Sequence, residues 1–269
     1  MPAISKILFP TDFSTYSNSA MEHAVAWANR FGASVHMLHV VTMHSYDPFN
    51  PDLGFPEVAL DETLRETAEE HLEELAEEAG RGPGPAITQE IRTGFSSWHE
   101  IMDAAEEQSA DLIVMATRGR KGLEKVFLGS TAEKVVEHAE CPVLLLRPRE
   151  EEGMPPAEEI HRIMLPSDFS TAASQAAPVA VELAQKTGAS LALFHCVEQD
   201  VPPPYYAAGV TSIFDLNDDV LSMARERLAE LLPEEYQEEV EHEFVVREGR
   251  SAQEIVSYAR ESATDLIVM

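Results

Sequence analysis

The segment Lys6-Ile-Leu-Phe-Pro-Thr-Asp-Phe-Ser-Thr15 decides the fold, because it returns later in the chain as Arg162-Ile-Met-Leu-Pro-Ser-Asp-Phe-Ser-Thr171. Two further blocks recur in the same order: Phe31–Val41 returns as Thr187–Val197, and Asp111–Met115 returns as Asp265–Met269. So long a period indicates duplicated domains, since solenoid repeats are only about 20–50 residues long. We therefore predict a first domain over residues 1–147, an exposed Glu- and Pro-rich linker over 148–160, and a second domain over 161–269.

Within one copy, short apolar runs alternate with longer amphipathic segments, which is typical of a parallel sheet covered by helices. The predicted strands are Lys6–Phe9, Ser34–Val41, Ile87–Arg92, Leu112–Ala116 and Val143–Arg147. The predicted helices are Ser17–Phe31, Glu62–Ala79, Trp98–Gln108 and Ser130–His138. The sequence thus predicts two tandem Rossmann-like α/β domains with parallel five-stranded sheets.

The second copy matches the first only as far as the fourth strand, and nothing answers to Ala116–Arg147. We therefore expect the second domain to be truncated after its fourth strand and incomplete at the C-terminus. In the predicted helix Glu62–Ala79, the spacing of three and four residues predicts one buried apolar stripe, opposite a solvated face rich in glutamate. Its members are Leu64, Ala68, Leu72, Leu75 and Ala79.

The chain is strongly acidic, with 48 Asp and Glu against 19 Lys and Arg and a net charge of −29. Such a field repels polyanions, which argues against nucleic acid or an anionic membrane as a partner. It would also suit a saline cytoplasm. No signal peptide or spanning segment is evident, so we expect a cytoplasmic protein without membrane insertion. Cys141 and Cys196 are the only cysteines, and we expect both to be buried thiols.

One segment after the predicted fourth strand reverses the general acidity. Four basic residues surround a single acid, Glu124: they are Arg118, Arg120, Lys121 and Lys125. Three glycines, Gly119, Gly122 and Gly129, allow close backbone approach and unusual φ values, and Gly129-Ser130-Thr131 leads into a helix whose free amides favour phosphate. The alternative is a purely structural role, in which Ser130 caps the helix and Glu133 completes a capping box.

Ligands of open parallel sheets bind beyond the carboxyl ends of the strands, where Asp12 lies at the end of the first strand. Its carboxylate could accept hydrogen bonds from a ribose or a base amine. Alternatively it caps the following helix, although Ser14 and Thr15 lie closer. Its counterpart Asp168 has the same two interpretations.

Nothing in the sequence nominates a general base. His36 and His39 are three apart on a strand and should point to opposite faces, and His39, like its counterpart His195, is expected in the core or behind the site. Ser96, Ser97 and His99 follow Gly94 as a turn and helix cap. Neither a GxSxG elbow, an HExxH motif nor a Walker-type P-loop occurs. We therefore expect no enzyme, or at most slow ATP hydrolysis.

Taken together, these segments resemble the universal stress protein family, and the chain is identified as a tandem member of it. Members of the ATP-binding branch carry G-x2-G-x9-G-[ST] after the fourth strand. Here the pattern reads Ala116-x2-Gly119-x9-Gly129-Ser130, so that alanine replaces the first glycine. The extra methyl group could weaken binding, although it need not abolish binding if φ is negative there.

The resemblance implies a residue set for adenine nucleotide (ATP, AMP or ADP), with Mg²⁺ accompanying the phosphates. The residues implied on the base and ribose side are Pro10, Thr11, Asp12 and Val40, those flanking ribose and phosphates are Met115, Ala116, Arg118 and Gly119, and those holding the phosphates are Gly129, Ser130 and Thr131. In the second copy the matching base-side residues are Pro166, Ser167, Asp168 and Cys196. We expect at most one nucleotide per chain.

The family also pairs domains through the fifth strand, so the resemblance implies a homo-oligomer through Val143, Leu144 and Leu145. Two functions remain open at this stage. The first is a stress-response or regulatory protein whose nucleotide state changes its oligomerisation or its protein partner. The second is a nucleotide-free module that docks on a transporter or enzyme. A true enzyme of the related adenine nucleotide α-hydrolase group is disfavoured, because catalytic candidates are lacking.

Overall fold

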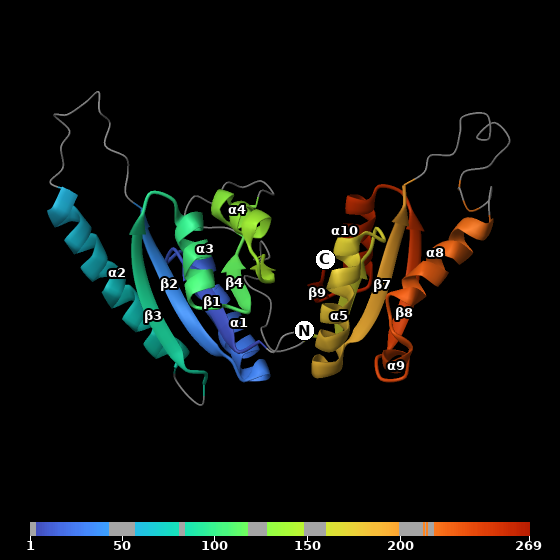
Figure 1. Cartoon of the computed structure of the whole chain (residues 1–269), viewed down its shortest axis with the longest axis horizontal. Coiled ribbons are helices and arrows are strands. Elements are labelled where there is room, and N and C mark those ends of the chain that lie inside the picture. Colours follow the sequence, from blue (N-terminus) through green and yellow to red (C-terminus); the bar gives the residue numbers. More distant parts are fainter. Residues whose placement is uncertain are drawn as a thin grey trace, which may run out of the picture. The chain divides into compact units, whose positions relative to one another are not determined.

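The computed structural model describes residues 4–42, 57–80, 84–117, 128–147, 160–198, 212, 214 and 218–269. It forms two compact units that divide between Glu158 and Glu159. Each unit is a parallel sheet with helices on its faces (Figure 1). The predicted linker over 148–160 lies outside the described residues except for Ile160.

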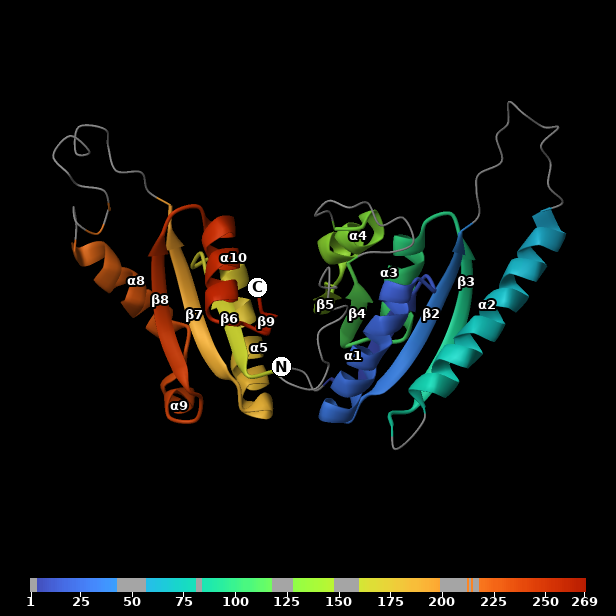
Figure 2. The same ribbon diagram turned by 180° about the vertical axis from the view of Figure 1, so that it is seen from behind.

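The first domain has a five-stranded sheet in the order β3-β2-β1-β4-β5. Its strands are β1 (Lys6–Thr11), β2 (Ser34–Thr42), β3 (Ile87–Gly94), β4 (Leu112–Ala116) and β5 (Val143–Leu146), all paired in parallel. Its helices are α1 (Thr15–Phe31), α2 (Glu57–Ala79), α3 (Ser97–Glu107) and α4 (Ser130–His138). Helices α1 and α2 cover one face of the sheet and α3 and α4 cover the other (Figures 1 and 2).

The second domain has a four-stranded parallel sheet in the order β8-β7-β6-β9. Its strands are β6 (Arg162–Pro166), β7 (Ser190–Val197), β8 (His242–Glu248) and β9 (Leu266–Ile267). Its helices are α5 (Thr171–Thr187), α8 (Asp218–Glu230), the short α9 (Glu234–Gln237) and α10 (Ser251–Glu261). The predicted pair of Rossmann-like α/β domains is confirmed, and the second sheet has four strands.

Two helices begin more than one residue earlier than the sequence predicts. Helix α1 starts at Thr15 because the hydroxyl of Ser14 caps it, accepting a hydrogen bond of 3.2 Å from the Ser17 amide. Helix α2 starts at Glu57, five residues before the predicted Glu62. Its described side chains become buried only from Ala68 onward, and Leu64 is 48% exposed. The prediction that Leu64 belongs to the buried stripe is therefore wrong, since the first turns of α2 extend beyond the sheet (Figure 1).

The core of each domain is built on its central strands. Ile7, Leu8 and Phe9 of β1 are fully buried, as are Ile163, Met164 and Leu165 of β6. Both cysteines are free thiols: Cys196 is buried and Cys141 is half-buried. Burial raises the pKa of both thiols, which keeps them protonated and unreactive near neutral pH.

A polar network lies on the α3 face of β2 and β3 in the first domain. His36 is buried, with Nδ1 2.8 Å from the Thr88 hydroxyl and Nε2 2.9 Å from the Glu90 carboxylate. Burial raises the pKa of Glu90, but the hydrogen bonds from Arg92 and His36 outweigh it and lower that pKa overall. Arg92 also donates to Glu107 of α3 at 2.6 Å, so that the network joins strand to helix.

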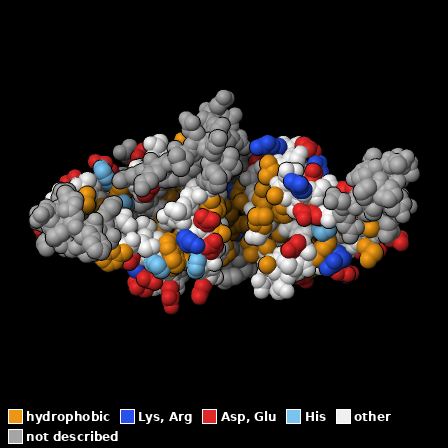
Figure 3. Space-filling view, turned by 90° about the horizontal axis from the view of Figure 1, so that it is seen from above, with side chains coloured by type: hydrophobic (Ala, Val, Ile, Leu, Met, Phe, Trp, Pro, Cys, Tyr) orange, Lys and Arg blue, Asp and Glu red, His pale blue; other side chains and the backbone are white. Residues whose placement is uncertain are grey.

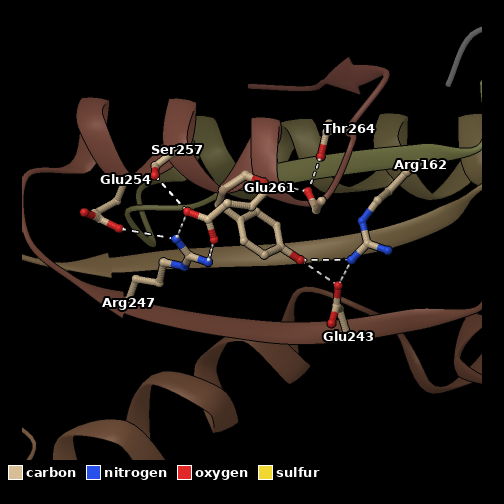
Figure 4. A network of polar contacts seen from close by, with 9 residues as sticks. Arg162, Glu243, Arg247, Glu254, Ser257, Glu261 and Thr264 are labelled. Carbon is tan, nitrogen blue, oxygen red and sulfur yellow. Dashed lines mark hydrogen bonds and ion pairs between the residues drawn. The ribbon is translucent and has the colours of Figure 1, made fainter.

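In the second domain the corresponding space between sheet and helix is filled by a side chain of the helix and not of the strand (Figure 4). Ala192 takes the position of His36. In the strand registers, His36 lies opposite Thr88 and Ala192 lies opposite Glu243. The space is filled by Tyr258 of α10, whose hydroxyl donates to Glu243 at 2.6 Å. Tyr258 stands where α3 has Ala104, because each lies seven residues before the aspartate that begins the third repeated block. Each domain therefore has one polar ring at this place between sheet and helix. The ring comes from the strand in the first domain, as His36, and from the helix in the second, as Tyr258.

A strand-to-helix ion pair is common to both copies. Arg247 of β8 donates to Glu261 of α10 at 2.6 Å, as Arg92 does to Glu107 in the first domain. Arg247 also lies 3.6 Å from Glu254 and over the ring of Tyr258 (Figure 4). Hydrogen bonds from Arg247 and then Ser257 lower the pKa of Glu261 to about 2.

Candidate functional site

The candidate site lies at the switch in strand order between β1 and β4. The chain leaves β1 toward β2 on one side, whereas β4 pairs with β1 on the other, with Leu8 opposite Ile113. Adjacent connections diverge at such a point and leave a crevice beyond the carboxyl ends of the strands. The arrowheads of the strands in Figure 1 point toward this edge of the sheet.

The β1 side of the site is a tight turn centred on Asp12. Asp12 Oδ1 accepts a hydrogen bond of 3.0 Å from the Ser14 amide. The hydroxyl of Thr11 accepts from the Phe13 amide at 3.1 Å and from the Ser17 hydroxyl at 3.0 Å. The cap of α1 is Ser14, so the alternative that Asp12 caps this helix is wrong. The carboxylate is instead fixed in the turn, half-buried at the edge of the sheet.

The β4 side of the site is tied directly to the start of α4. The Thr117 amide donates to the Leu146 carbonyl oxygen at 2.9 Å, and the Thr117 carbonyl oxygen accepts from the Gly129 amide at 2.9 Å. Thr117 therefore links the ends of β4 and β5 to the first residue before α4. The N-terminus of α4, with its free amides, is held beside the end of β4.

Gly129 is needed for close approach and not for an unusual backbone angle. Its φ is −61°, which any residue can adopt, so the prediction of an unusual φ is wrong at this position. A Cβ atom there would lie 3.2 Å from the Thr117 carbonyl oxygen, which is a tight contact. Gly129 is also the cap of α4, and no side chain caps this helix. The interpretation of Ser130 as the cap of a capping box is therefore wrong, and Ser130 is the exposed first residue of the helix.

The other predicted residues fall on both sides of this arrangement. Met115 is buried near the end of β4 and Ala116 ends that strand half-buried, with no positive φ. Val40 packs half-buried near the end of β2. Arg118 and Gly119 lie outside the described residues, as do the remaining members of the basic segment: Arg120, Lys121, Gly122, Glu124 and Lys125. The described part of the site is thus Pro10 to Asp12 on one side and Ala116, Thr117 and Gly129 to Thr131 on the other.

The second domain repeats the β1 side of the site. Asp168 Oδ1 accepts from the Ser170 amide at 2.8 Å, and the Ser167 hydroxyl accepts from the Phe169 amide at 3.0 Å. Hydrogen bonding from the side chain and backbone of Ser170 lowers the pKa of Asp168. Pro166 is the last residue of β6, and Cys196 stands at the end of β7 with its thiol 3.4 Å from the Gly249 carbonyl oxygen.

The described histidines do not form a metal site. His36 and His39 serve different faces of β2, as predicted: His36 contacts β3, and His39 contacts the Asp12 turn. Among the described residues, no group of three or more His, Cys, Asp and Glu side chains lies close enough to hold a metal ion. Ser96 occupies the cap position of α3, in line with its interpretation as a turn residue. Sequence reasoning missed Phe13, although its repetition in Asp-Phe-Ser-Thr marks it in both copies.

Similarity to known proteins extends over both domains. The model of the universal stress protein family matches residues 3–147 and again residues 159–269. A universal stress protein of Methanocaldococcus jannaschii is 38% identical over 146 residues, which is 53% of this chain and 81% of that protein. Another from Bacillus subtilis, YxiE, is 32% identical over 149 residues, 53% of this chain and 99% of the relative.

Among solved structures, a universal stress protein from Archaeoglobus fulgidus superposes with a TM-score of 0.69 at 22% identity, covering 99% of this chain and 86% of the other. At that level of identity the likeness shows the fold alone. It extends over both domains. No helix in the described part of the chain is both long and apolar enough to span a bilayer.

Proposed function

The chain belongs to the universal stress protein family of stress-response proteins, and we propose that its first domain binds ATP or AMP. One observation carries this proposal: the bond between Gly129 and Thr117 holds the N-terminus of α4 at the end of β4. The amides of a helix N-terminus attract phosphate, and a Cβ at residue 129 would narrow this approach. In the second domain β9 is the counterpart of β4, and the described residues contain no counterpart of α4.

The two sides of the crevice would contact different parts of the nucleotide. Pro10, Thr11, Asp12 and Val40 would contact the adenine and ribose, with the Asp12 carboxylate accepting hydrogen bonds from hydroxyl or amine donors. The amides of Ser130 and Thr131 would hold the phosphates, together with Arg118 and Gly119. Met115 and Ala116 lie between these two groups. Mg²⁺, if it accompanies the phosphates, would offset their negative charge in a chain whose own net charge is −29.

We further propose that the protein acts in the cytoplasm through its nucleotide state, which would change its oligomerisation or a protein partner. The β5 edge supports this idea. Val143, Leu144 and Leu145 are only half-buried on a strand that pairs on one side with β4. An exposed apolar edge strand is a template for pairing with a second copy. Catalysis beyond slow hydrolysis is not part of the proposal, because the described site offers no group poised as a general base.

Calorimetry tests the proposal directly. ATP and AMP are titrated into the wild type, into Gly129→Arg and into Val136→Arg. In Gly129→Arg the introduced side chain would occupy the approach to Thr117, so we expect binding to the wild type and none to this variant. Val136 is 46% exposed on the same helix, so its replacement adds the same charge away from the crevice and should keep binding. If neither nucleotide binds the wild type below about millimolar concentrations, the proposal is wrong.

A nucleotide-free docking module is the second candidate, and Ala116 favours it. Alanine stands in place of the first glycine of the nucleotide pattern, which leaves a methyl group at the end of β4. In this case the wild type and Gly129→Arg would bind no nucleotide, and both would still retain a protein partner in pull-down from lysate. Retention that depends on added ATP would favour the nucleotide-binding function instead.

A further inference from the structure

The residue that follows the site aspartate adopts a left-handed backbone in both copies. Phe13 has φ 59° and Phe169 has φ 62°, a region that bulky side chains rarely enter. Such a conformation is strained and persists only where surrounding contacts enforce it. Because the same strain occurs twice in one chain, the surroundings of both rings should explain it.

Each phenylalanine ring packs against a histidine ring of the neighbouring strand, stacked in the first copy and tilted in the second. The ring of Phe13 lies 4.2 Å from that of His39, with 28° between their planes. The ring of Phe169 lies 4.3 Å from that of His195. A second side chain from the following helix covers each phenylalanine: His71 of α2 contacts Phe13 edge-on at 5.2 Å, and Arg227 of α8 lies 4.1 Å over Phe169.

The same histidine also holds the backbone on the other side of the aspartate. Nδ1 of His39 donates to the Thr11 carbonyl oxygen at 2.8 Å, and Nδ1 of His195 donates to the Ser167 carbonyl oxygen at 2.7 Å. A carbonyl oxygen only accepts, so the Nδ1 atom carries the proton in this arrangement. One imidazole therefore fixes both neighbours of Asp12, through a hydrogen bond to Thr11 and a ring contact with Phe13.

From this geometry we propose that His39 and Phe13 are positioning residues, which set the direction of the Asp12 carboxylate toward the base and ribose. This inference rests on the proposed nucleotide site. The strained Phe13 turns the chain directly after Asp12, and the Ser14 amide then reaches Asp12 Oδ1. A carboxylate held in place before the ligand arrives binds more tightly, because no ordering is left for the binding step.

Adenosine affinity, measured by calorimetry on the full chain, tests the inference. Replacement of the donor in His39→Leu should weaken adenosine by about tenfold, the equivalent of about one charge-assisted hydrogen bond. His39→Asn keeps an N–H donor near Nδ1 and should recover part of the loss. Phe13→Gly removes the ring but accepts the left-handed backbone without strain, so the fold is retained while adenosine binding falls.

Two comparisons separate positioning from a general loss of stability. His195→Leu and Phe169→Gly remove the same contacts in the second domain and should leave adenosine affinity unchanged. In an Asp12→Ala background, His39→Leu should have no further effect, because the histidine acts through the aspartate. If the wild type binds adenosine and both His39→Leu and Phe13→Gly bind it equally well, this inference is wrong while the proposed function stands. Failure of the wild type to bind adenosine, ATP or AMP would overturn the proposed function itself.

Discussion

The amide of Gly129 donates a 2.9 Å hydrogen bond to the carbonyl oxygen of Thr117, and this bond joins the start of α4 to the end of β4. The two residues are separated by a segment outside the described part of the chain, and the bond holds the helix N-terminus beside the end of β4. It also leaves little room at the glycine, since a Cβ would lie 3.2 Å from the same oxygen.

Gly129→Ala should therefore lower stability and nucleotide affinity together. At φ −61° an alanine is not strained, so the cost comes from the tight contact and from the poorer helix cap, about 0.5–2 kcal/mol in total. Urea denaturation measures the free energy of unfolding, and calorimetry measures binding. Gly84→Ala is the control, because its Cβ would meet an oxygen only at an ordinary 3.9 Å. Equal stability of Gly129→Ala and wild type would refute the tight contact.

His36 and Ala104 of the first domain should be coupled, because the second domain has the opposite pair, Ala192 and Tyr258. His36→Ala alone leaves Glu90 and Thr88 without the imidazole, and Ala104→Tyr alone overfills the core, each costing about 1–3 kcal/mol. In the double variant the tyrosine ring can enter the space that the imidazole leaves. We expect the double variant to be more stable than the sum of the singles predicts, by about 1 kcal/mol. Additive losses in chemical denaturation would contradict this exchange.

The Glu261 carboxylate should titrate far below an ordinary glutamate. Its pKa in the folded protein is about 2 against an ordinary value of 4.5. Because the folded pKa is the lower one, its contribution to stability is present above about pH 4.5 and is lost as the pH falls toward about 2. NMR titration of the side-chain carboxyl group measures this directly. In Arg247→Leu the pKa should rise toward 4.5, and an unchanged pKa in that variant would exclude Arg247 as the cause.

Much of the fold can be predicted from the sequence because its signals are local. The strand positions follow from short apolar runs, and the repeated blocks establish the second domain without further evidence. The cap of α1 at Ser14 is also local. Leu64 is an exception to this local predictability. Helical spacing assigns it to the buried apolar stripe, but it is exposed because the sheet does not reach that turn of the helix.

The candidate site is predictable only in part, because its geometry depends on pairs distant in sequence. The sequence identifies Asp12 and Gly129 as candidate site residues. It does not reveal the Thr117 carbonyl oxygen, whose close approach makes glycine necessary at position 129. It likewise gives no sign that Phe13 and His39 stack, since that contact depends on the register of β1 and β2. Ser130 appears as a cap in the sequence, whereas the close approach of Gly129 moves the cap back by one residue.

Equivalent positions on α3 and α10 should respond differently to charge. Met102 and Val256 each lie nine residues before the repeated aspartate. Met102 packs into the core cluster that α4 completes.

Val256, by contrast, is 47% exposed on the face of α10 that includes Ala252 and Arg260. Hydrophobic side chains are also visible on the surface of the second domain (Figure 3). Met102→Lys should therefore lower the free energy of unfolding by about 1–3 kcal/mol, and Val256→Lys should change it by less than about 0.5 kcal/mol. Val256→Lys should in addition reduce binding of a hydrophobic dye, because it removes apolar surface from that face. Equal losses of stability in the two variants would show that a further contact covers Val256 in solution.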